Sequence, residues 1–191
     1  MKQEILDYLK EDEKNLKNIL EQTLEICKAS IMMNPSSLQY VRNQTEEICL
    51  FAIKLDPSVL PYVKNQTEEI CLAAVKKNGE ALCYVREQTE EICLTAVKEN
   101  GWALQYVKNQ TPEICLEAVK QSSSVIELVK EQIPPELCLE AVKKDPYALM
   151  YIKNQTPEIC LAAIKHNQFA IKYIKNLTPE LIKYLYENLE N

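Results

Sequence analysis

Cysteine recurs in this chain at a nearly constant interval, and that interval constrains the fold more than any other feature of the sequence. Seven of the eight cysteines lie 22, 22, 22, 22, 23 and 22 residues apart. Similar residues surround each of them, as in the stretch from Gln88 to Asn109, QTEEICLTAVKENGWALQYVKN. The repeated cysteines are Cys27, Cys49, Cys71, Cys93, Cys115, Cys138 and Cys160. A fixed period of this length predicts a chain built from copies of one small structural unit.

Each copy carries the signals of two short helices. Thr89 and its equivalents suit a helix N-cap, and the Glu or Pro that follows is favoured in the first turn. A first helix of about ten residues is predicted from there, with Ile92, Cys93 and Val97 on one face. Asn100 and Gly101 then begin a second helix of about seven to eight residues. Asn109 is expected to end it in the left-handed conformation.

Two helices this short cannot bury an apolar face without neighbours, so successive copies must stack. The sequence therefore predicts an all-α fold, a right- or left-handed α-solenoid of two-helix repeats with N- and C-terminal caps. Residues 1–21 are predicted to be an N-terminal helical cap, residues 22–176 seven tandem repeats and residues 177–191 a C-terminal helical cap. The sixth repeat, from Gln132, contains one extra residue.

The regular spacing also decides how the cysteines are interpreted. No CxxC pair occurs and His166 is the only histidine, so zinc ligands do not cluster. Each repeated cysteine lies among apolar residues at a position that suits a small buried side chain. We expect core cysteines, and neither disulfides nor a metal or other cofactor.

Composition limits the range of partners. The formal net charge of −6 disfavours nonspecific attraction to nucleic acids and to anionic membranes. No apolar run approaches the roughly 18 residues that span a bilayer, and the charged start lacks the apolar core of a signal peptide. A cytoplasmic location is expected.

The repeated motif, Gln-Thr-Glu/Pro-Glu-Ile-Cys-Leu-x-Ala-Val-Lys followed by Ala-Leu-x-Tyr-Val-Lys-Asn, resembles a known family over residues 22–182. It is similar to the tandem short helical repeats of large DNA viruses and some bacteria that are known as a domain of unknown function. The resemblance implies an all-α repeat protein and a viral or mobile-element origin. It implies no catalytic residues.

Positions that vary between copies are candidates for binding, because constant positions usually serve the stack. Two variable columns and a nearly constant Tyr column lie close together on the second helix. Their aromatic content is typical of residues that anchor protein interfaces, although packing between repeats is an equal alternative. The candidate partner-binding residues are Trp102, Gln105, Tyr106, Tyr147, Met150, Tyr151, Phe169, Lys172 and Tyr173.

A basic residue near the end of each second helix forms a ladder with two interpretations. It could bind a phosphate backbone, as in repeat proteins that bind RNA, or complement helix C-termini and the Glu residues of adjacent units. The acidic net charge favours the second interpretation. The ladder comprises Arg42, Lys64, Arg86, Lys108, Lys130, Lys153 and Lys175.

Catalysis has little support, because no Ser or Cys has a histidine at a motif spacing and the recurring Glu residues form a capping pattern. We therefore expect a non-enzymatic helical-repeat protein that binds a protein partner with a basic surface. The narrower hypothesis is a phage or viral inhibitor of a host defence factor, acting in the host cytosol. The alternative is an RNA-binding repeat protein that uses the basic ladder.

Overall fold

The structure is a computed structural model that describes residues 2–130 and 133–188. Those residues form helices and connecting loops, and none of them is in a β-strand. The chain divides into two compact units, residues 1–99 and 100–191. The predicted start of the sixth repeat, Gln132, lies outside the described residues, as do residues 189–191 of the predicted C-terminal cap.

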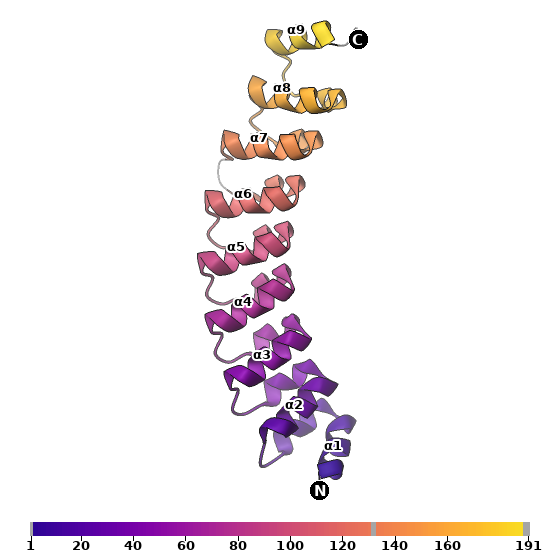
Figure 1. Ribbon diagram of the computed structural model, residues 1–191, viewed down its shortest axis with the longest axis vertical. Helices are drawn as coiled ribbons and strands as arrows, with labels where there is room; N and C mark the ends of the chain where they lie inside the picture. Colours follow the sequence, from indigo (N-terminus) through magenta and orange to yellow (C-terminus); the bar gives the residue numbers. More distant parts are fainter. Residues whose placement is uncertain (1, 131–132, 189–191) are drawn as a thin grey trace. The chain divides into compact units, whose positions relative to one another are not determined.

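The N-terminal unit alternates ten-residue α-helices with six-residue 3-10 helices (Figure 1). Its elements are α1 (Lys2–Glu11), η1 (Glu13–Asn18), α2 (Leu24–Met33), η2 (Pro35–Tyr40), α3 (Glu46–Leu55), η3 (Pro57–Tyr62), α4 (Glu68–Lys77), η4 (Gly79–Tyr84) and α5 (Glu90–Glu99). The first pair, α1 and η1, has the same form as the pairs that follow it. Each α-helix contacts the next α-helix, and each 3-10 helix contacts the next 3-10 helix, so the unit has an α-layer and a 3-10 layer.

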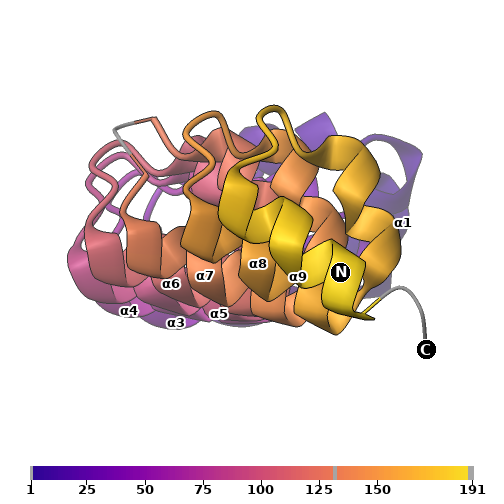
Figure 2. The same cartoon turned by 90° about the horizontal axis from the view of Figure 1, so that it is seen from above.

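The C-terminal unit has the same construction. Its elements are η5 (Gly101–Tyr106), α6 (Pro112–Gln121), η6 (Ser123–Leu128), α7 (Pro135–Lys144), η7 (Pro146–Tyr151), α8 (Pro157–His166), η8 (Gln168–Tyr173) and α9 (Pro179–Asn188). The contacts again run from α6 through to α9 and from η5 through to η8. Within each unit the loops from one repeat to the next follow one edge, which is clearest from above (Figure 2).

This arrangement confirms the predicted all-α solenoid of two-helix repeats and corrects its second helix. That helix is a 3-10 helix of six residues and not a helix of seven to eight. The predicted left-handed Asn is wrong, because no described non-glycine residue has a positive φ. The second helix ends instead at an extended residue such as Val107, whose N–H donates to the carbonyl of Leu104 (3.1 Å). A 3-10 turn can close in this way without a left-handed residue.

Side-chain caps begin both helices of a repeat. Thr89 Oγ1 accepts a hydrogen bond from the N–H of Ile92 (3.3 Å), as predicted for the first helix. Asn100 Oδ1 accepts from the N–H of Trp102 (3.0 Å) and so begins the 3-10 helix. Because these caps are local in sequence, each copy that carries them sets its own helix boundaries. Ser122 before η6 and Pro134 before α7 make no side-chain cap bond.

The core repeats with the sequence. In α5 the buried side chains are Ile92, Cys93, Ala96 and Val97, and α4 buries the equivalent four. All seven repeated cysteines are reduced and 1–3 % exposed, so their predicted place in the core is confirmed. Burial of one face of every short helix against its neighbours is what stabilises the stack.

A glutamine joins consecutive 3-10 helices, a role that the sequence did not suggest. Gln44 Nε2 donates to the carbonyls of Leu38 (2.9 Å) and Tyr62 (3.0 Å), and its Oε1 accepts from the N–H of Lys64 (2.8 Å). It therefore links the C-terminal ends of η2 and η3. The same three bonds are made by Gln22, Gln66, Gln110 and Gln155.

Candidate interaction surfaces

The 3-10 layer of the C-terminal unit exposes large apolar side chains, which we call the aromatic face. Trp102 on η5, Tyr147 and Met150 on η7 and Phe169 on η8 are 39, 37, 47 and 65 % exposed. Between them, η6 contributes the smaller and polar residues Ser124 and Glu127. Each 3-10 helix contacts the next, so these side chains belong to one layer. Exposed residues of this kind are the usual anchors of protein interfaces.

Two tyrosines and a lysine form an ordered cluster on this face. The rings of Tyr147 and Tyr173 meet edge to face, with centroids 5.8 Å apart. Lys172 Nζ lies 4.9 Å from the centroid of Tyr173 and 5.5 Å from that of Tyr147. Tyr147 Oη accepts a hydrogen bond from Asn167 Nδ2 (3.2 Å). These contacts fix the orientation of the Tyr147 ring, which stays partly exposed.

The other candidate residues divide between surface and stack. Gln105 is exposed, and its Nε2 donates to the carbonyl of Trp102 in its own turn (3.1 Å). The constant tyrosines Tyr106, Tyr151 and Tyr173 are half-buried. The structure thus places Trp102, Met150 and Phe169 outermost, while the constant tyrosines combine packing with partial exposure.

Several members of the basic ladder donate hydrogen bonds to the protein backbone. Lys64 Nζ donates to the carbonyls of Val41 (3.0 Å) and Arg42 (2.9 Å), just after the end of η2. Lys130 donates to the carbonyl of Val107 (2.7 Å), and Lys175 to that of Ile152 (3.0 Å). Cations at these carbonyls complement the partial negative charge of the preceding helix end.

The two arginines of the ladder do the same. Arg42 donates to the carbonyls of Leu20 (2.9 Å) and Lys17 (2.7 Å), and Arg86 donates to three carbonyls at the end of η3. Lys108 and Lys153 are also exposed. Five members of the ladder thus have a structural use, and none of these bonds involves the recurring Glu residues named in the sequence-based alternative.

Exposed Glu pairs mark the α-layer of the N-terminal unit. Three of its helices begin Glu-Glu, at Glu46, Glu68 and Glu90, whereas the α-helices of the C-terminal unit begin with proline. One carboxylate of a pair bonds to the next repeat, as where Glu46 Oε1 accepts from Thr67 Oγ1 (2.9 Å). The carboxylates therefore support the stack and also give this edge a negative charge.

Burial lowers the reactivity of the seven repeated thiols. Burial raises the pKa of Cys138 to about 11 and raises the pKa values of Cys27 and Cys160. Within the part of the chain that the structure describes, no three His, Cys, Asp or Glu side chains are grouped so that they could hold a metal ion. No helix in residues 2–130 and 133–188 is long and apolar enough to cross a membrane.

One family model matches the chain, described as "Domain of unknown function (DUF4116)". It matches three consecutive segments, residues 45–88, 89–133 and 135–177. Each match spans about two of the 22-residue repeats, so the family's module is a pair of the units defined by the cysteines. Neither the curated proteins nor the solved structures contain a match to the chain.

Proposed function

Because the chain belongs to the DUF4116 family, a domain of unknown function whose module is a pair of helical repeats, we propose that it is a non-enzymatic scaffold that binds a protein partner. The aromatic face is the proposed binding surface. The observation that carries this proposal is the exposure of Trp102, Tyr147, Met150 and Phe169 on one layer of the C-terminal unit. Burial of such side chains by a partner gives favourable free energy, and aromatic residues lose little conformational entropy on binding.

The narrower proposal is that the partner is a host defence factor with a basic surface, and that the chain is its phage or viral inhibitor. The acidic net charge of −6 and the exposed Glu pairs support a basic partner. The viral origin rests on the resemblance of the repeat motif.

The test compares the aromatic face with an equally apolar surface elsewhere. In one variant Trp102, Tyr147 and Phe169 become Ser, and in the matched control Leu177, Ile182 and Tyr186 become Ser. The control residues are 53, 48 and 76 % exposed and lie on or beside α9. Tagged wild-type chain and both variants are used to capture partners from cells that carry the gene, with quantitative mass spectrometry as the readout.

We expect one set of proteins to be retained by the wild type and the control and reduced at least tenfold with the aromatic-face variant. Circular dichroism should show the same helicity for all three chains. Equal retention by both variants would contradict the proposal. Loss of helicity in the aromatic-face variant would instead assign its residues to the stack.

A further inference from the structure

A groove of about 320 Å³ lies in the N-terminal unit where α1 and α2 end. Lys10, Glu11 and Asp12 line it from the end of α1. Ser30 of α2 and Ser37 of η2 line it from the first repeat. Carbonyls at helix C-termini and two carboxylates give such a groove a negative potential.

The two serines distinguish this groove from the same place in later repeats. Ser30 and Ser37 are 2 and 0 % exposed. The position of Ser30 holds Ala in all six later repeats, and the position of Ser37 holds Val or Ala. Ser37 Oγ is buried and has no hydrogen-bond partner within residues 2–130 and 133–188. An unpaired buried hydroxyl is costly, so its presence here favours a ligand that supplies the missing bond.

Two of the six later repeats show that a lysine ammonium fits at this place. Lys77, the last residue of α4, donates from Nζ to the carbonyls of Lys54 and Leu55 at the end of α3, the second bond being 2.9 Å. Lys144, the last residue of α7, likewise donates to the carbonyl of Lys120 in α6. In both cases a lysine ammonium occupies the gap between the ends of two consecutive α-helices.

The first repeat has the acceptors of this arrangement without the lysine. The residue equivalent to Lys77 is Met33, which lines the groove, and the acceptors equivalent to Lys54 and Leu55 are the carbonyls of Lys10 and Glu11. A thioether donates no hydrogen bond. The ammonium that α4 and α7 supply from their last residues is therefore missing here, as it is in the later repeats that carry Leu55, Glu99, Gln121 or His166 at this position. The two serines are what set the first repeat apart from those four.

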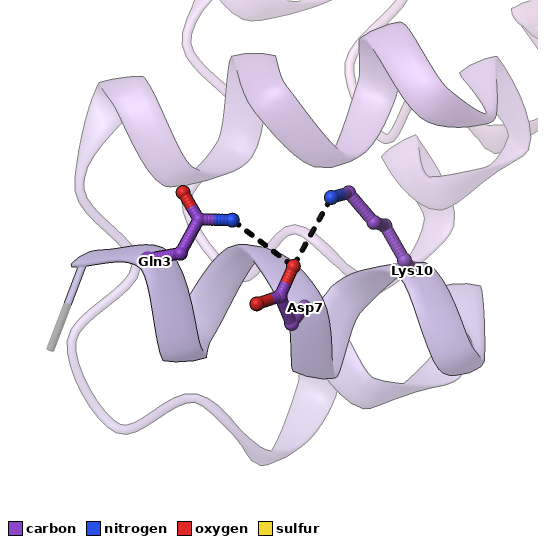
Figure 3. A network of polar contacts seen from close by, with 3 residues as sticks. All are labelled: Gln3, Asp7 and Lys10. Carbon is purple, nitrogen blue, oxygen red and sulfur yellow. Dashed lines mark hydrogen bonds and ion pairs between the residues drawn. The ribbon is translucent and has the colours of Figure 1, made fainter.

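Lys10 lines the groove, but its ammonium contacts Asp7 on α1. Lys10 Nζ lies 3.1 Å from Asp7 Oδ1, which also accepts from Gln3 Nε2 (3.0 Å), so the lysine side chain lies along α1 (Figure 3). The hydrogen bond from Lys10, followed by that from Gln3, lowers the pKa of Asp7. Asp7 thus holds Lys10 along α1. Glu11 and Asp12 remain in the lining of the groove, and the Asp12 carboxylate also accepts a hydrogen bond from the N–H of Lys14 (2.8 Å).

We propose that this groove binds a primary alkylammonium group, from either a free amine or a lysine side chain of another molecule. Its three N–H groups would donate to one carbonyl at the end of α1 and to the hydroxyl oxygens of Ser37 and Ser30. Glu11 and Asp12 would balance its charge. This inference is independent of the aromatic face, which lies in the other unit.

The test is a titration of the ¹⁵N-labelled full-length chain followed by NMR. One arm uses n-butylammonium chloride and the other uses Nα-acetyl-lysine-N-methylamide. Tetramethylammonium chloride at equal ionic strength is the control, because it has the charge but no N–H donor. We expect saturable shifts of the amides of Glu11, Asp12, Ser30 and Ser37 with at least one primary ammonium and not with tetramethylammonium. Saturation with n-butylammonium identifies a free amine as the ligand, and saturation only with Nα-acetyl-lysine-N-methylamide identifies a lysine side chain.

Variants make the test specific. Met33→Lys should place an internal ammonium in the groove, as Lys77 does, and weaken binding at least tenfold. Met32→Lys is the matched control. Met32 is 68 % exposed, so this substitution adds the same charge one position away and outside the groove lining. The double variant Ser30→Ala, Ser37→Ala restores the residue types of later repeats and should also weaken binding. Absence of saturable shifts in both arms, equal shifts with tetramethylammonium, or unchanged binding by Met33→Lys and by the double variant would overturn the proposal.

Discussion

At the scale of the residue, the eight thiols fall into two environments. The seven repeated cysteines are 1–3 % exposed and face the core, whereas Cys83 on η4 is exposed. Thiol reagents attack the thiolate and need access to it. With a pKa raised to about 11, Cys138 has little thiolate at pH 8 in addition to being buried. Burial therefore protects the repeated cysteines, whereas Cys83 is accessible although partial desolvation also raises the pKa of its thiol.

We predict that native protein at pH 8 reacts rapidly with one equivalent of Ellman's reagent, and that unfolding in guanidinium exposes all eight thiols. The Cys83→Ser variant should lose the rapid phase, and peptide mapping of the wild type should place the label on Cys83. Rapid reaction of several thiols in the native chain would contradict their place in the core.

At the scale of the element, the repeated glutamine joins neighbouring 3-10 helices through three hydrogen bonds. Six-residue 3-10 helices have few internal bonds, and their last carbonyls and the N–H groups beyond them need partners. Gln44 satisfies two carbonyls and one N–H, on two different repeats, at 2.8 to 3.0 Å. It is half-buried, so water replaces those bonds poorly when the side chain is lost.

Replacing Gln44 by Met keeps the side-chain length and removes all three bonds. We predict a decrease in the free energy of unfolding of about 2–3 kcal/mol, measured by urea denaturation. The control is Gln39→Met, because exposed Gln39 makes one bond, within its own turn, to the carbonyl of Ser36 (3.1 Å). That change should stay within about 0.5 kcal/mol of the wild type. Similar losses for the two variants would refute the special role of Gln44.

Local signals explain which parts of this architecture could be predicted from the sequence. The Thr and Asx caps and the buried face of α5 depend on residues within about four positions, so periodicity and capping rules found them. The length and type of the second helix were missed, because capping signals do not distinguish a 3-10 helix from an α-helix. The bonds of Gln44 were missed because their partners in the next repeat lie 18 and 20 residues away.

Candidate surfaces were harder to predict for the same reason. Variation between copies pointed to Trp102 and Phe169, which are exposed. The same comparison could have singled out Ser30 and Ser37, since both differ in type from every later copy. Their significance appears only when the groove beside α1 is known. The direction of the basic ladder also required the fold, because Lys64 reaches carbonyls 22 and 23 residues earlier in the chain.

At the scale of the whole molecule, the charges are unevenly distributed along the chain. Residues 1–99 contain 17 acidic and 12 basic side chains, so they account for −5 of the net charge of −6. The basic residues that could have formed a phosphate-binding stripe include Arg42, Lys64, Arg86, Lys130 and Lys175, which donate to backbone carbonyls. A phosphate would have to compete with these bonds and with the surrounding carboxylates.

We therefore predict no saturable binding of a fluorescent single-stranded RNA at 50 mM salt, measured by anisotropy. Lys64→Met and Lys175→Met should each lower the free energy of unfolding by about 1–2 kcal/mol, because helix-end carbonyls lose a charged donor. Lys54→Met, at an exposed lysine of α3, is the control and should have little effect. A phosphate-binding ladder would give the opposite pattern. RNA would bind at 50 mM salt, the affinity would fall roughly 1,000-fold by 200 mM, and the ladder variants would lose RNA binding while keeping their stability.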